Sequence, residues 1–83
     1  MKNIAYSKSA IRALRKMPTP DARRITEKVE QFASDPSSLA HNVKALKGSD
    51  FIRLRVGNWR VIMDDTNTVL AVLKIGPRGS VYE

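Results

Sequence analysis

The first part of the chain places apolar residues at helical spacing. Residues 2–6 (KNIAY) form a short run that predicts a strand, and Ser7 follows it as a candidate N-cap. Between Ser7 and Pro18, apolar residues recur every three or four positions and predict a first helix over residues 9–16. These residues are Ala10, Ile11, Leu14 and Met17. Pro18 ends this helix, because proline disfavours a helical conformation in the residue before it.

A second helix is predicted directly after the first. Thr19 is a candidate N-cap, and Pro20 suits the first helical position, where a missing N–H costs nothing. Asp35-Pro36 ends this helix, and the short connection before it predicts that the two helices form an antiparallel hairpin. One face of the second helix is apolar and consists of Ala22, Ile25, Val29, Phe32 and Ala33.

After Gly48 the apolar pattern changes from helical spacing to alternation. Residues 37–50 are predicted as a loop, with at most a short helical turn at residues 39–43. Three strands follow at residues 51–56, 59–64 and 69–75, and Gly57-Asn58 is a two-residue hairpin signal. Gly76-Pro77 ends the last strand.

These elements predict one α+β domain that spans residues 1–83, since a chain of 83 residues rarely divides. An N-terminal strand precedes the helical hairpin, and the hairpin packs on one face of a mostly antiparallel β-sheet.

The two strands around Gly57-Asn58 have a register that the turn fixes. Centring the turn there pairs Arg55 with Arg60, and side chains on each strand alternate between faces. One face of this ribbon is then entirely apolar and must pack on the helices: Ile52, Leu54, Val56, Trp59, Val61 and Met63. The opposite face carries Phe51, Arg53, Arg55, Arg60 and Ile62.

The second face brings three arginines within about 8 Å of one another. Like charges directly opposed across strands destabilise a sheet by roughly 0.2–1 kcal/mol. The nearest acids, Asp50 and Asp64, lie at the far end of the ribbon. Arginine on an exposed sheet is also ordinary solvated surface, but the absence of interleaved acids favours a binding site for an anion, which would turn repulsion into attraction.

Charge and composition point the same way. Fifteen Lys and Arg against eight Asp and Glu give a net charge of +7 and a pI near 10.3. A domain this basic is a candidate nucleic-acid binder, although the same positive electrostatic potential would also attract an acidic protein partner. The chain has no cysteine, which excludes disulfides and thiolate metal sites. No signal peptide or membrane span is recognisable, so a cytoplasmic protein with no membrane association is expected.

Two segments closely resemble the C-terminal half of RelE-type toxins, within the RelE/ParE superfamily of type II toxin–antitoxin toxins. They are LKGSDFIRLRVGNWRVIM (residues 46–63) and VLAVLKIGPRGSVYE (residues 69–83). The family pattern has a leucine, a glycine, a basic strand "RLRVGdYRVIY", then "IGxR" and a terminal "VY". The resemblance implies a RelE-like microbial RNase fold and a toxin that cleaves mRNA in the ribosomal A site without a metal or other cofactor.

The resemblance also assigns the site. Attack of a 2′-hydroxyl on the adjacent phosphate would give a cyclic phosphate and a free 5′-hydroxyl. Arg60 would stabilise charge on that phosphate, Arg78 would hold it or assist the leaving oxygen, and Tyr82 would stack on or orient the target base. The catalytic set is Arg60, Arg78, Tyr82 and Arg55, and the RNA-binding set is Arg53, Arg55, Lys47 and Lys44.

The general base stays open in this reading. Several relatives have lysine where this chain has Arg53 and Arg55, and arginine does not lose its proton in proteins. His41 is interpreted as an ordinary loop residue, because a general base needs a positioned partner.

The resemblance implies partners as well. A cognate antitoxin would neutralise the toxin, the ribosome and mRNA would be its targets, and operator DNA would be reached only through the antitoxin. Two alternatives are a ParE-like inhibitor of DNA gyrase and a non-catalytic nucleic-acid-binding module.

Overall fold

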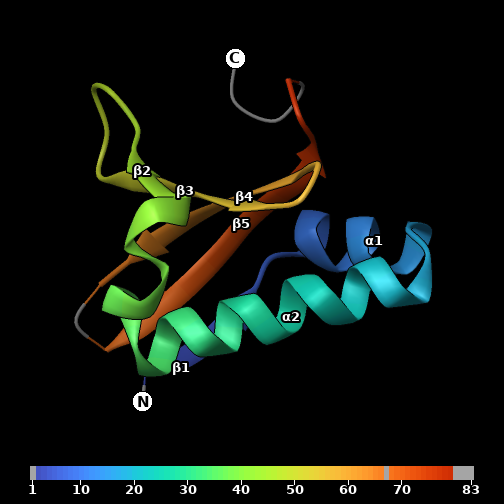
Figure 1. Ribbon diagram of the computed structural model, residues 1–83, viewed down its shortest axis with the longest axis horizontal. Coiled ribbons are helices and arrows are strands. Elements are labelled where there is room, and N and C mark those ends of the chain that lie inside the picture. The colour runs from blue at the N-terminus through green and yellow to red at the C-terminus, as the bar shows by residue number, and fades with distance from the viewer. Residues whose placement is uncertain (1, 67, 80–83) are drawn as a thin grey trace.

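The computed structural model describes residues 2–66 and 68–79 (Figure 1). It contains five strands, two α-helices and one 3-10 helix. In chain order they are β1 (Asn3–Tyr6), α1 (Lys8–Lys16), α2 (Thr19–Ser34), the 3-10 helix η1 (Pro36–Asn42), β2 (Val43–Ala45), β3 (Phe51–Val56), β4 (Trp59–Asp65) and β5 (Val69–Pro77).

The five strands form one sheet in the order β1-β5-β4-β3-β2. Only β1 and β5 run parallel, and the other three neighbouring pairs are antiparallel. The chain reverses direction between α1 and α2, and both helices lie on the same side of the sheet (Figure 1). The predicted α+β architecture with a helical hairpin on a mostly antiparallel sheet is therefore confirmed.

The predicted register of β3 and β4 is also confirmed. Arg55 pairs with Arg60, and Leu54 pairs with Val61. The apolar face packs on the helices, where Ile25 and Val29 of α2 are fully buried in the same core. This packing is the reason that the register is well defined, because a slip of one residue would turn the apolar side chains outward.

Ser7 connects the first helix to the last strand. Its Oγ accepts a hydrogen bond from the N–H of Ala10 at 3.0 Å, which confirms the predicted N-cap. The same hydroxyl donates to the carbonyl of Leu73 at 2.7 Å. Leu73 lies where the β4–β5 register shifts, between the pairs of Ile62 with Lys74 and Met63 with Val72. One side chain thus caps α1 and satisfies the carbonyl at a β-bulge.

The predicted cap of the second helix is wrong. The helix already includes Thr19, its N-cap is Pro18, and no side chain caps it. The carbonyl of Pro18 accepts from the N–H groups of Asp21 at 3.0 Å and Ala22 at 3.1 Å. Proline has a carbonyl but no N–H, so it can open a helix by accepting these bonds without a capping side chain.

The segment 37–50 is more regular than the predicted loop. It contains most of η1 and the three-residue strand β2, which pairs with β3 at the edge of the sheet. A strand of three residues is too short to show the alternation by which the longer strands are recognised. Leu39, buried within η1, anchors the segment in the core.

We predict that Ser7→Ala lowers the free energy of unfolding by about 1–2 kcal/mol, because it removes a helix cap and leaves the Leu73 carbonyl without its donor. Urea denaturation followed by circular dichroism measures the change. Ser37→Ala is the control: Ser37 is an exposed serine that bonds only Asp35 nearby, and its loss is expected to cost less than about 0.5 kcal/mol. Equal effects of the two substitutions would contradict the role of Ser7.

Candidate functional site

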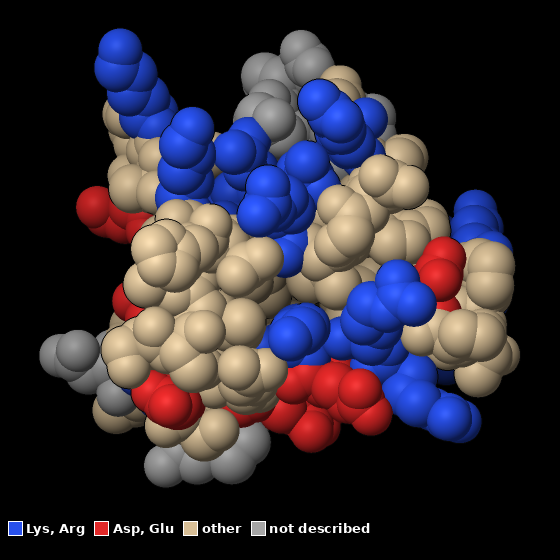
Figure 2. Space-filling view, viewed as in Figure 1, with Lys and Arg blue, Asp and Glu red and all other residues tan. Residues whose placement is uncertain are grey.

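The side of the sheet opposite the helices carries a cluster of cations. Across the sheet, Lys44 pairs with Arg53, Arg53 with Ile62, and Ile62 with Lys74. Directly paired residues share a face, so these side chains form one row, with Arg55 and Arg60 in the adjacent row. We call this surface the basic face and define it by Lys44, Arg53, Arg55, Arg60 and Lys74. Figure 2 shows one group of Lys and Arg at the top of the view, away from α1 and α2, and further Lys and Arg over the two helices.

The basic face has an apolar floor and few acids. Ile62, at its centre, is only 5% exposed, whereas Lys44, Arg55 and Lys74 are exposed. Among the paired strand residues that the structure describes, the acid on this side is Asp64, which pairs with Phe51 at the far end of β3. Asp64 therefore lies at the end of the ribbon away from Arg60, and the surface around Arg60 is suited to an anion.

Arg60 is held differently from the other cations. It is only 9% exposed, and its Nη1 donates to the carbonyls of Gly57 and Trp59, each at 3.0 Å. Every buried side-chain nitrogen in the described part of the molecule has a hydrogen-bond partner. The turn therefore fixes the guanidinium through Nη1.

The turn that holds Arg60 is itself attached to α2. The indole Nε1 of Trp59 donates to Oδ2 of Asp21 at 3.1 Å. Gly57 has a φ of 58°, and a Cβ placed on it would lie 3.7 Å from Nη1 of Arg24. Trp59 was predicted only to pack in the core. It also joins the hairpin to the first turn of the helix, and Asp21 was missed because nothing in the sequence links two residues 38 positions apart.

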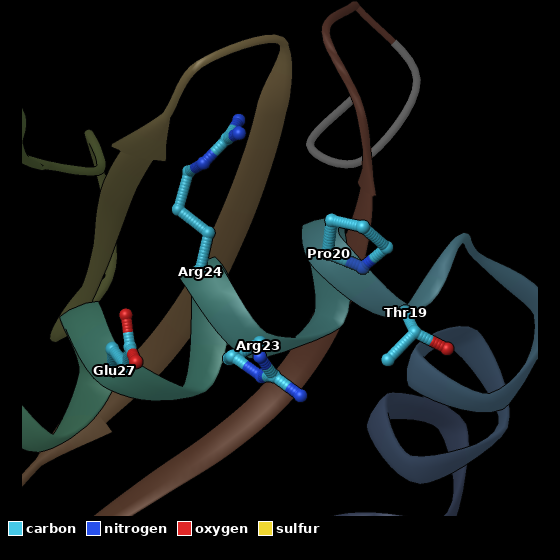
Figure 3. A pocket seen from close by; sticks show the side chains of 5 residues that line it. All are labelled: Thr19, Pro20, Arg23, Arg24 and Glu27. Carbon is cyan, nitrogen blue, oxygen red and sulfur yellow. The ribbon is translucent and has the colours of Figure 1, made fainter.

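Arg24 belongs to a hollow of about 320 Å³ on α2, lined also by Thr19, Pro20, Arg23 and Glu27. Figure 3 shows Arg24 extending away from the helix axis, while Arg23 points in another direction. Arg24 thus adds a cation near the Gly57 turn, but it comes from the helical side of the sheet and is separate from the basic face.

Arg78 lies beside the same turn. Its backbone N–H donates to the carbonyl of Asn58 at 2.7 Å, and the residue is exposed. The sequence did not reveal whether Arg78 lies near the arginines of β3 and β4, because the order of the strands was unknown. The hydrogen bond places Arg78 next to the segment that connects Arg55 and Arg60. Tyr82 lies outside the described residues.

A smaller hollow of about 150 Å³ opens at the β2 side of the basic face. It is lined by His41, Asn42, Val43, Lys44, Arg53 and Arg55. His41 and Asn42 end η1, and they meet the cations because β2 continues directly from η1 and pairs with β3.

Three predicted RNA-binding residues line this hollow, and Lys47 does not. Lys47 is exposed in the turn between β2 and β3, where Leu46 N–H donates to the Phe51 carbonyl at 3.0 Å. That turn lies at the end of β3 opposite Arg55. Sequence reasoning also missed Lys74, because the bulge in β5 shifts its alternation relative to β4.

Other features of the chain lie away from this face. Burial raises the pKa of Tyr6, and the carboxylate of Glu30 raises it further. Within residues 2–66 and 68–79, no three side chains of His, Asp or Glu gather closely enough to hold a metal ion. In the same residues no helix has the length and apolar character of a membrane span.

A family model described as "ParE toxin of type II toxin-antitoxin system, parDE" matches residues 4–82. The chain belongs to this toxin family. The comparison with curated protein sequences gave no match.

Solved structures place the toxin near RelE-type proteins. A chain of the archaeal RelE–RelB complex from Pyrococcus horikoshii OT3 is 28% identical, with a TM-score of 0.81 and coverage of 95% of this chain and 97% of that chain. A chain of the intact E. coli RelBE complex is 17% identical, with a TM-score of 0.76 and coverage of 93% and 96%. YafQ from E. coli BL21(DE3) is 13% identical, with a TM-score of 0.73 and coverage of 96% and 97%. The last two establish the shared fold alone.

We predict that Lys74→Gln weakens binding of a single-stranded RNA that carries 2′-deoxy sugars to prevent cleavage. If Lys74 contacts a phosphate, its loss reduces the slope of log affinity against log salt by about 0.7. Fluorescence anisotropy at several salt concentrations measures this slope. Lys28→Gln is the matched control, because Lys28 lies on α2 and donates to Gln31. An unchanged slope for Lys74→Gln, or an equal change for Lys28→Gln, would exclude Lys74 from the binding surface.

Proposed function

We propose that this toxin is an endoribonuclease that cleaves mRNA in the A site of the ribosome and thereby inhibits translation. The observation that carries the proposal is the anchored Arg60. Two backbone carbonyls hold its Nη1, and its strand position lies on the same face of the sheet as the exposed cations Lys44, Arg55 and Lys74. The similarity to RelE-type structures, at 28% identity in the archaeal case, supports the same activity.

The reaction fits this arrangement of charges. Attack of a 2′-hydroxyl on the adjacent phosphate increases the negative charge on the phosphoryl oxygens. Arg60 would donate to those oxygens, and a guanidinium held before the reaction stabilises the transition state without reorganising. Arg53, Arg55 and Lys44 would bind the flanking backbone, because fixed positive charge supplies most of the affinity for nucleic acid.

Arg78 is assigned to the same phosphate. Its backbone bond to Asn58 places it at the turn next to Arg60, where its side chain would hold the phosphate or assist the leaving 5′ oxygen. Stacking of the target base on Tyr82 remains a prediction. The mechanism needs no metal, since the guanidinium groups supply the positive charge that a metal ion would otherwise provide.

We also propose that a cognate antitoxin binds this toxin in the cytoplasm. Several similar structures are toxin–antitoxin complexes, including the RelB–RelE complex from Methanococcus jannaschii. A net charge of +7 favours an acidic partner, and a partly disordered segment can wrap a large surface. Contact with operator DNA would come through the antitoxin.

The decisive experiment maps mRNA cleavage on programmed 70S ribosomes. We predict that Arg60→Ala lowers the single-turnover cleavage rate by about 10²–10³-fold while ribosome binding changes little. Arg60→Lys keeps the positive charge but loses the planar guanidinium. Its cleavage rate should lie between the rates of the parent protein and of Arg60→Ala. Arg15→Ala, an exposed arginine on α1, is the control.

Circular dichroism must show that each variant is folded, because Arg60 is nearly buried. A ribosome-free reaction tests whether RNA alone suffices. Cleavage that survives Arg60→Ala, or no cleavage by the folded parent protein, would contradict the proposal.

Inhibition of DNA gyrase is the second candidate, because the matching family model is named for ParE. A supercoiling assay with purified gyrase separates the two functions. If the parent protein inhibits supercoiling and leaves mRNA intact on ribosomes, the gyrase reading replaces the nuclease. A protein that does neither, but binds RNA with a steep salt dependence, is a binding module.

A further inference from the structure

The proposed cleavage needs a group that accepts the proton of the attacking 2′-hydroxyl. The arginines of the basic face cannot serve, because the guanidinium group stays protonated in proteins. Histidine is the side chain whose ordinary charge change falls between pH 5 and 8, and imidazole is the commonest general base. The chain contains one histidine, His41.

His41 lies beside cations of the basic face. It is exposed at the end of η1 and lines the same hollow as Arg53 and Arg55. Arg55 is the direct cross-strand partner of Arg60, so the hollow lies one strand away from Arg60 on the same face of the sheet. At about 150 Å³ the hollow is smaller than sites for whole drug-sized ligands, which occupy about 300–1,000 Å³. A space of this size suits one phosphate or sugar group.

The charged groups around the hollow divide into two kinds. Lys44 faces it from β2, Arg53 and Arg55 face it from β3, and His41 faces it from η1. Among the described residues that line the hollow, three carry a positive charge and could attract phosphate oxygens. His41 contributes an imidazole, whose neutral form has a ring nitrogen that can accept a hydrogen bond from a hydroxyl.

We propose that His41 is the general base of the reaction, an inference that rests on the proposed nuclease function. One nitrogen of the neutral imidazole takes the proton of the 2′-hydroxyl as the 2′ oxygen bonds to phosphorus. The bond from phosphorus to the 5′ oxygen breaks, and that oxygen takes a proton from water. The resulting hydroxide is neutralised by the proton that His41 then releases, so the products are a 2′,3′-cyclic phosphate and a 5′-hydroxyl.

The test is single-turnover cleavage on programmed ribosomes across the pH range in which imidazole titrates, between about pH 5 and 8. We expect His41→Gln to reduce the rate at neutral pH by about 10²–10⁴-fold. The parent profile should fall toward acid, and the variant profile should lack that fall. Binding to ribosomes carrying 2′-deoxy mRNA should be unchanged, since the base acts on the reaction rather than on affinity.

Ala40→Gln is the matched control. It places the same amide on the preceding exposed residue of η1, outside the lining of the hollow, and should keep the parent rate and profile. Chemical rescue adds a second readout. The His41→Ala variant should regain cleavage activity when imidazole is added, because free imidazole can occupy the place of the missing side chain. A merely structural role for His41 would not produce this rescue.

The outcomes separate the two proposals. If Arg60→Ala abolishes cleavage but His41→Gln keeps the parent rate and the acidic fall, the nuclease stands and the base is another group. If Lys44→Gln removes the acidic fall and His41→Gln does not, the base is Lys44. If the folded parent protein does not cleave mRNA, the nuclease function and the role of His41 are both wrong.

Discussion

The site depends on the pairing of β3 with β4 across the Gly57–Asn58 turn. This pairing turns six apolar residues of the two strands toward the helices and all three arginines away from them, together with Phe51 and Ile62. The hydrogen bond from Trp59 to Asp21 attaches the turn to α2, and the carbonyls on either side of Asn58 hold Arg60. Core packing and arginine placement are therefore consequences of one register. A shift of one residue would lose both together.

The sequence predicted this register because the glycine turn centres it and both strands alternate over six residues or more. Alternation did not predict the structure in two segments, β5 and β2. The β4–β5 pairing contains a bulge, so alternation along β5 does not indicate which face Lys74 occupies. Strand β2 has three residues and follows a 3-10 helix, and neither gives a periodic signal. His41 was interpreted as an ordinary loop residue because no positioned partner was recognised for it, and the pairing of β2 with β3 brings it to the hollow that Arg53 also lines.

The basic face has a cost for the free protein. Arg55 and Arg60 are direct cross-strand neighbours, and like charges in that position repel each other. An 83-residue domain has a small core and little stability in reserve. Any anion that binds only the folded chain stabilises it by mass action, whether the anion is RNA or an acidic protein segment. Recognition and stability are thus linked through the same side chains, and a mutation that relieves the repulsion would strengthen the fold while weakening binding.

The parallel pair of β1 and β5 has a consequence for how the toxin is made. Residues 3–6 pair with residues 69–72, and Ser7 bonds the Leu73 carbonyl, so both contacts span most of the chain. Contacts so distant in sequence form late in folding, because a long loop must close first. During synthesis the N-terminal strand leaves the ribosome well before its partner has been translated. The sheet that carries Arg60 therefore remains incomplete until residues 69–72 have also left the ribosome.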